Sequence, residues 1–175
     1  AISHYEFYES GLSKNPVPKT MVVHEFFDKG AKDMWTYYCG SQCINVSNCH
    51  FAMELARVRC IGTQMFKYDI KGFLHWGYNY YNNQWSYDML DPFASSDGEC
   101  FAASGDTYMV YPAPDGTPWE STRLRAFYEG LEDMRVMQLA EKLCGKDAVV
   151  KAIEDIVGEV RFDKCICDSD TMLAV

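Results

Sequence analysis

Long apolar runs are absent from this sequence, and so is any excess of basic residues. No stretch approaches the roughly 18 consecutive apolar residues that cross a membrane, and from the first residues given we expect no signal peptide. Lysine and arginine number 16 against 25 aspartates and glutamates, which gives a net charge of −9. Because this charge repels phosphate backbones and anionic lipids, we expect neither nucleic acid nor a membrane as a partner.

Paired metal-binding cysteines are also lacking, although the chain contains eight cysteines. Cys39 and Cys43 are separated by three residues and Cys165 and Cys167 by one, so neither pair is a CxxC unit. The histidines are scattered along the chain: His4, His24, His50 and His75. We therefore predict no metal site and no cofactor. Reduced structural thiols are the favoured interpretation and indicate a cytoplasmic protein, with a disulfide or a metal site as the alternative.

Helical and extended patterns alternate along the 175 residues, 48% of which are hydrophobic and suffice for one domain core. The alternation predicts an α/β fold with parallel strands. The expected helices are Thr20–Phe27, His50–Tyr68, a long helix ending at Cys144, and Asp147–Val157. The expected strands are Asp33–Cys39, Gly72–Trp76 and Tyr108–Tyr111.

The long helix has the clearest start signal. Thr117-Pro118-Trp119-Glu120 places a capping residue before a proline and a glutamate three residues after the cap. Gly145 lies just beyond the expected end of this helix. Its predicted buried stripe consists of Leu124, Phe127, Leu131, Met134 and Leu139.

The segment from Lys71 to Asp91 is the most informative in the chain. Gly72–Trp76 is an apolar run typical of a strand covered on both faces, and a loop dense in tryptophan, tyrosine and asparagine follows it. Aromatic rings beside amide side chains suit a ligand with apolar faces and many hydroxyls, which describes a sugar. The alternative interpretation is a tyrosine-rich loop packed under its neighbours.

Several sequence blocks resemble, in their order and spacing, the C-terminal catalytic-domain segment of family 123 glycoside hydrolases and their uncharacterised relatives. The blocks are MWTYYCG (Met34–Gly40), DIKGFLHWGYNYY (Asp69–Tyr81), DPF (Asp91–Phe93), GDTYMVYPAPDG (Gly105–Gly116), STRL (Ser121–Leu124) and GLED (Gly130–Asp133). The resemblance implies a (β/α)8 TIM-type barrel. MWTYYCG would be its seventh strand and GFLHWGYNYY its eighth.

On this resemblance the chain holds about strands six to eight of the barrel and their helices. Residues 1–145 would belong to the barrel and residues 146–175 would be a helical extension of the same domain. Because a complete barrel needs at least about 200 residues, we expect the chain to be part of a longer protein. The rest of the barrel, or self-association, would then cover the exposed sheet edges.

Characterised members of the family resemble retaining hexosaminidases that use the acetamido oxygen of the substrate as the nucleophile. The resemblance implies an adjacent Asp-Glu pair as the catalytic carboxyls, and this sequence contains no Asp-Glu dipeptide. Its other adjacent acids, Glu132-Asp133 and Glu154-Asp155, lie in predicted helices, where ion pairing explains them better. We therefore expect no catalytic residue in this chain.

The chain is instead expected to supply one wall of a sugar pocket. Trp76 is the first choice for a platform under the sugar ring, and Tyr38 or Tyr37 for a hydroxyl that binds the acetamido oxygen. Tyr78 and Asn79 are second choices. The predicted function is thus part of a glycoside hydrolase, with an N-acetylhexosaminidase as the activity that the resemblance implies. The alternative is a non-catalytic carbohydrate-binding or scaffold module.

Supporting roles are expected for residues around this wall. Arg123, at the start of a helix beneath a loop rich in proline and glycine, is predicted to pair with Asp106 or Asp91 and pin that loop. Direct contact with the sugar is the alternative. His75 is offset by one position from Trp76, so we expect it to point towards the helical layer as a structural histidine.

Overall fold

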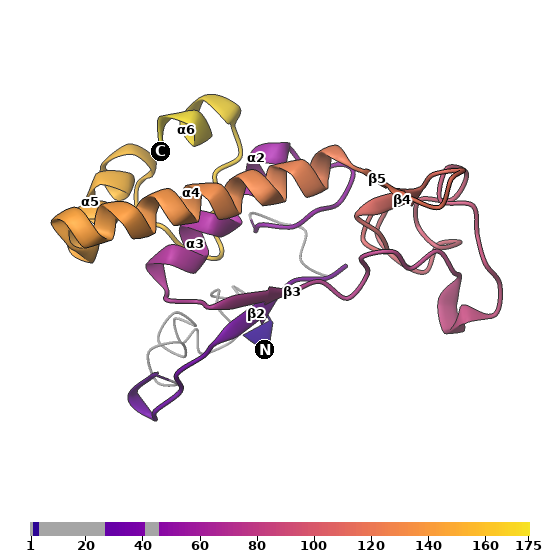
Figure 1. Cartoon of the computed structure of the whole chain (residues 1–175), viewed down its shortest axis with the longest axis horizontal. Helices are drawn as coiled ribbons and strands as arrows, with labels where there is room; N and C mark the ends of the chain where they lie inside the picture. Colours follow the sequence, from indigo (N-terminus) through magenta and orange to yellow (C-terminus); the bar gives the residue numbers. More distant parts are fainter. Residues whose placement is uncertain (1, 4–26, 41–45) are drawn as a thin grey trace, which may run out of the picture.

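The computed structural model describes residues 2–3, 27–40 and 46–175 of the chain. In this part of the chain, helices lie on one side of a small parallel sheet, and an irregular region with a second sheet extends beyond one end of the longest helix (Figure 1). The predicted helix Thr20–Phe27 falls outside the described residues except for Phe27. Within the described ranges, no helix is both long enough and apolar enough to cross a membrane.

The main sheet has three parallel strands in the order β1 (Ile2–Ser3), β2 (Trp35–Tyr37) and β3 (Gly72–Leu74). Parallel pairing of the two aromatic strands is therefore confirmed, although both strands are shorter than predicted. In the register, Tyr37 lies opposite Leu74. Three strands form no closed barrel, so the (β/α)8 barrel stays a prediction.

Among the described residues, no element covers the face of β3 away from the helices, so the cover on both sides stays a prediction for this face. Leu74 is 45% exposed and Trp76, just after the strand, is 40% exposed. Side chains alternate between the two faces of a strand, so Phe73 points the other way. It packs against the helices, with its ring centroid 5.0 Å from that of Phe127. The helices thus cover one face only.

The helix predicted over His50–Tyr68 is divided into α2 (Leu55–Arg59) and α3 (Ile61–Lys67). Residues 50–54 lie outside both helices, because this segment instead pairs with the irregular region, for example through Phe51 N–H to the Ser104 carbonyl. Cys60 separates the helices but keeps a near-helical backbone, and its N–H still donates to the Ala56 carbonyl. The apolar residues Ile61 and Met65 of α3 are buried.

The long helix α4 (Thr122–Cys144) crosses α2 and α3 at a point where only glycine fits. A Cβ on Gly62 would overlap the carbonyl oxygen of Gly130, and a Cβ on Gly130 would overlap that of Arg59. The Arg59 side chain then reaches α4, where it donates to both carboxylate oxygens of Asp133 at 2.7 and 2.9 Å. Asp133 therefore forms an ion pair, as expected, but with Arg59 of α2 and not within its own helix.

The predicted start of α4 is wrong by four residues. Ser121 is the N-cap, and its hydroxyl accepts the Leu124 N–H at 3.1 Å. Thr117 instead bonds to Asp115, and Pro118–Glu120 forms β5, which pairs antiparallel with β4 (Val110–Pro112). Strand pairing has therefore overridden the local capping signal. Residues Gln84–Ser86 form the short 3-10 helix η2 in the same irregular region.

The predicted buried stripe of α4 holds only in its first half. Leu124, Phe127, Leu131 and Met134 pack against the core. Leu139, however, is 59% exposed, and Met137 is buried in its place. Met137 belongs to a second apolar cluster, to which α3 and α5 (Lys146–Val157) also contribute side chains. Helix α5 begins one residue before the start that the sequence predicted. The last helix is α6 (Ser169–Ala174), and Asp168 is its N-cap.

Candidate sugar-binding site

An open pocket of about 630 Å³ lies beyond the C-terminal ends of β2 and β3. This end of parallel strands is where α/β proteins build their ligand sites. The pocket is lined by three segments that are distant in the sequence: Cys39 and Gly40 after β2, Trp76 after β3, and Phe101, Ala102, Ala103 and Asp106 from the irregular region.

Trp76 and Phe101 are the aromatic side chains of the pocket wall, and the Trp76 ring is held at its polar edge. The indole Nε1–H donates to Asp106 Oδ2 at 3.0 Å. Asp106 is only 2% exposed, whereas Trp76 is 40% exposed. Tyr80 and Phe101 support the indole, with ring centroids 5.6 and 5.8 Å from it. Trp76 is therefore an exposed ring fixed by a buried carboxylate.

Arg123 holds the loop that carries Asp106. Its buried guanidinium donates to the carbonyl oxygens of Gly105 at 2.5 Å and Tyr108 at 2.8 Å, on either side of Asp106. It also donates to the Cys49 carbonyl at 2.9 Å, so it joins this loop to the segment before α2. Its partners are thus carbonyl oxygens rather than the carboxylates that the sequence predicted.

Asp91, the other predicted partner of Arg123, lies in a turn of its own. Its carboxylate accepts the Phe93 N–H at 2.9 Å, and its carbonyl accepts the N–H groups of Ala94 and Ser95. The side chain is exposed and does not line the pocket. Asp91 therefore shapes the start of the irregular region locally.

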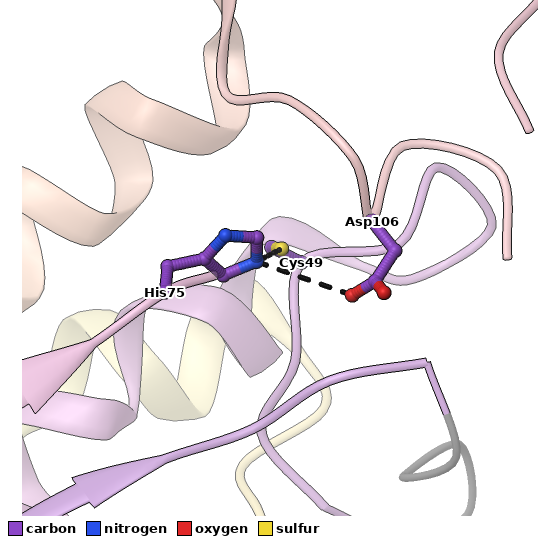
Figure 2. Close-up of side chains that lie close together, drawn as sticks. All are labelled: Cys49, His75 and Asp106. Atoms are coloured by element: carbon purple, nitrogen blue, oxygen red, sulfur yellow. Dashed lines mark hydrogen bonds and ion pairs between the residues drawn. The ribbon is translucent and has the colours of Figure 1, made fainter. Parts of the chain in front are cut away.

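Beneath the pocket, Cys49, His75 and Asp106 converge from three segments (Figure 2). Cys49 Sγ lies 3.1 Å from His75 Nε2, which lies 4.0 Å from Asp106 Oδ1. His50 Nε2 is 3.6 Å from the same carboxylate oxygen. His75 thus points towards the helical side of β3, as predicted, and contacts the core tyrosine Tyr38 edge-on.

The tautomer of His75 follows from its backbone contact. The Gly77 N–H donates to His75 Nδ1 at 3.1 Å, so Nδ1 carries a lone pair. Burial lowers the pKa of His75 below its ordinary 6.5, and the nearby charges of Arg123 and His50 lower it further, against the opposing effect of Asp106. The ring is therefore neutral at pH 7, with its proton on Nε2, and this N–H faces Cys49 and Asp106.

Within the described residues, Cys49, His75 and Asp106 are also the group whose donor atoms could hold a metal ion. These atoms all lie within 4.8 Å of one another. The protonation pattern does not fit that use. A metal-bound histidine donates its second ring N–H to an acceptor, but Nδ1 of His75 faces the Gly77 N–H, itself a donor. Burial also raises the pKa of Cys49 to about 12, which keeps it a thiol. The cluster fits a hydrogen-bonded network.

The predicted tyrosines lie on opposite faces of β2. Tyr38 is fully buried in the core, 4.7 Å from the Phe73 ring centroid, and burial raises the pKa of its hydroxyl well above 10.0. Tyr37 is half-buried and lies opposite Leu74, on the face that Trp76 shares by alternation. Of the two, Tyr37 therefore lies on the face of the sheet that carries Trp76, although neither tyrosine lines the pocket.

The second-choice residues follow Trp76 along the chain. Tyr78 and Asn79 are both exposed. Asn79 forms an isolated antiparallel bridge with Tyr108, and the Tyr78 carbonyl accepts the Met109 N–H at 2.8 Å. Their backbones therefore attach the aromatic segment to the loop of Asp106, while neither side chain lines the pocket.

Residues 1–140 match the sequence profile of the family described as Glycoside hydrolase 123, catalytic domain. The chain belongs to this family. No curated protein matches the chain. The resemblance drawn from the sequence blocks is thus confirmed, and membership of a glycoside hydrolase family implies a carbohydrate substrate.

Several residues in and beneath the pocket of this family 123 domain were not predicted from the sequence. Tyr80 lies in the aromatic segment, where its spacing of four from Trp76 could have paired the two rings. Phe101, Cys49 and His50 carry no local signal, because they reach the site through irregular backbone. Only their long-range contacts reveal them.

Proposed function

We propose that this chain forms the C-terminal part of a (β/α)8 barrel in a retaining N-acetylhexosaminidase and supplies the aromatic wall of its sugar pocket. The observation that carries the proposal is the Trp76 ring, exposed and fixed at its edge by Asp106, beyond the C-terminal ends of parallel strands. Family membership supports a carbohydrate as the molecule that this ring meets.

The open face of the sheet supports the barrel part of the proposal. Trp35, Leu74 and Trp76 are large apolar side chains exposed on the face away from the helices. A parallel sheet is normally buried on both faces, since its crossover helices cover one side and further strands or helices the other. The remaining strands of a barrel, or a second copy of the chain, would remove these side chains from water.

In the proposed reaction the residues of this chain bind and orient the sugar. The Trp76 ring packs against the C–H groups of the pyranose or the acetamido methyl group. The Tyr37 hydroxyl donates to the acetamido oxygen and holds it below the anomeric carbon. That oxygen attacks the anomeric carbon as the glycosidic bond breaks, and a carboxylic acid protonates the leaving oxygen.

The acid in this proposal comes from another part of the parent protein. The sequence has no Asp-Glu dipeptide. Asp133 is held by Arg59 where α4 crosses α2 and α3, and Glu132 pairs with Arg135 on α4. Neither residue lines the pocket of Trp76. The chain alone should therefore bind the sugar without hydrolysing it.

Binding of methyl 2-acetamido-2-deoxyhexosides, measured by NMR titration, tests the proposal. Trp76→Ala should weaken binding about tenfold, because a ring stacked on a sugar is worth roughly 1.4 kcal/mol. The matched control is Trp85→Ala, which removes a 74% exposed ring that does not line the pocket. Equal affinity of wild type and Trp76→Ala would overturn the proposal, and hydrolysis of a chromogenic glycoside by this chain would overturn the missing-acid part of it.

One observation favours a second function, a non-catalytic carbohydrate-binding module. The acid pair that the hydrolase needs is missing from this sequence. The same aromatic wall would then bind a sugar without any reaction. The parent protein distinguishes the two functions. It hydrolyses 2-acetamido glycosides if it is the proposed hydrolase, and it only binds them if it is a carbohydrate-binding module.

A further inference from the structure

We infer that Asp106 is a positioning residue, which acts on the sugar by fixing the orientation of the Trp76 indole. The inference rests on the proposed role of Trp76 as the platform. Asp106 lies 30 residues further along the chain than Trp76, and its Oδ2 accepts the indole N–H at 3.0 Å. The sequence predicted only that Asp106 supports a loop.

The hydrogen bond from the Trp76 indole to Asp106 has a preferred direction, whereas packing contacts between side chains do not. The indole N–H is the single hydrogen-bonding group of tryptophan, and a bond to a carboxylate is about twice as strong as one between neutral groups. Tyr80 and Phe101 contact the indole with their planes inclined by 53° and 73°, so neither stacks flat on it. Inclined contacts of this kind fix the ring orientation less closely than a directed hydrogen bond, so we assign the orientation of the indole to its bond with Asp106.

The Asp106 carboxylate is itself held in place by its surroundings, so it can fix the position of the indole. Arg123 binds the carbonyls of Gly105 and Tyr108 around it. Gly40 and Gly77 leave just enough space: a Cβ on Gly40 would lie 3.3 Å from Asp106 Oδ2, and one on Gly77 would lie 2.6 Å from the Asp106 carbonyl. Both the side chain and the backbone of Asp106 are therefore confined.

The second carboxylate oxygen faces the buried network of Figure 2. Asp106 Oδ1 has no hydrogen-bond partner among the described residues. The nearest ring nitrogens are those of His50 and His75, at 3.6 and 4.0 Å. Both nitrogens lie beyond hydrogen-bond distance, so the two rings surround this oxygen and fill the space beside it without bonding to it. The chain of contacts runs from the core through Asp106 to the exposed ring.

A double-mutant cycle tests the inference. The variants are Asp106→Asn, Trp76→Phe and their combination, and the measured quantity is affinity for a methyl 2-acetamido-2-deoxyhexoside. Asp106→Asn should weaken binding roughly fivefold, since a neutral amide holds the indole less firmly. Trp76→Phe keeps a ring but removes the N–H. In that background Asp106→Asn should have no further effect, because its route to the sugar is gone.

The indole resonance gives a readout that does not depend on the sugar. In ¹H–¹⁵N spectra, Asp106→Asn should shift the Trp76 indole signal and speed its exchange with water, while the other indole signals stay in place. Asp91→Asn, an exposed aspartate outside the pocket, is the matched control and should move none of them.

Two results would overturn the inference. One is an equal loss of affinity from Asp106→Asn in the wild-type and Trp76→Phe backgrounds, which would show that Asp106 acts independently of the ring. The other is an unchanged Trp76 indole signal in Asp106→Asn. Failure of the proposed function is distinguishable, because it appears as full affinity in Trp76→Ala.

Discussion

Trp76 and Asp106 come from different segments of the chain, yet the indole of one donates to the carboxylate of the other at 3.0 Å. This bond joins the end of β3 to the irregular region that Arg123 holds in place. It also joins an exposed aromatic ring to a buried carboxylate, the arrangement on which the proposed sugar contact rests.

Arg123 and the three carbonyl oxygens that it binds form a clamp on the irregular region. Substitution of Arg123 should lower the stability of the protein more than other substitutions in this region. Arg123→Lys keeps the charge but cannot reach three carbonyl oxygens with a planar fork. Buried carbonyls then lose their donors, so we expect the free energy of unfolding to fall by about 2–3 kcal/mol in urea titrations. Arg125→Lys, at an exposed ion pair, should change it by less than about 0.5 kcal/mol. Equal effects of the two substitutions would contradict the clamp.

The glycine contact between α3 and α4 predicts a steric effect. Gly62→Ala should lower the free energy of unfolding by about 1–3 kcal/mol, because its Cβ would overlap the Gly130 carbonyl and force the helices apart. Gln138→Ala, which changes an exposed position of α4 and creates no overlap, is the control and should be nearly neutral. A Gly62→Ala variant as stable as wild type would show that the helices do not cross so closely.

A pH dependence follows from His75. Its pKa in the folded protein lies below 6.5 because burial disfavours the charged ring. As the pH falls, the unfolded chain therefore binds a proton at His75 before the folded chain does, and stability decreases below pH 6.5. We expect His75→Gln to show a flatter dependence of the free energy of unfolding between pH about 7 and about 5. Identical slopes in variant and wild type would contradict a buried neutral His75.

Metal binding offers a test of the protonation pattern beneath the pocket. If His75 carries its proton on Nε2, the cluster of Figure 2 has no free nitrogen for an ion. Zn²⁺ affinity measured by calorimetry should then be the same for wild type and Cys49→Ser, whatever the exposed Cys167 and other thiols contribute. A zinc site lost in both Cys49→Ser and Asp106→Asn would show that the cluster is a metal centre.

The sequence predicted those features that local chemistry decides. Aromatic runs located β2 and β3, the alternation of elements predicted their parallel pairing, and Gly145 marked the end of α4. Trp76 was chosen as the platform because it directly follows a strand among tyrosines and asparagines. The structure places it in the pocket lining, and its contact with a sugar stays a prediction.

What the sequence did not predict depends on contacts between distant segments. Thr117–Glu120 has a strong capping pattern, but pairing with β4 outweighs it. The buried face of α4 was misjudged at Leu139 because this helix carries apolar side chains on more than one side, so their spacing does not define a single face. Cys49 and His75 meet across 26 residues, a relationship that no spacing rule contains.

The most direct test of the central claim is an NMR titration of this chain with a methyl 2-acetamido-2-deoxyhexoside, followed at the tryptophan indole signals. If the pocket beyond β3 is a sugar site, the Trp76 indole responds at the lowest sugar concentrations and Trp85 and Trp119, which do not line the pocket, stay in place. A Trp76 signal that does not move while wild-type protein is saturated, or no binding at all, would contradict the claim that Trp76 is the platform of this family 123 domain.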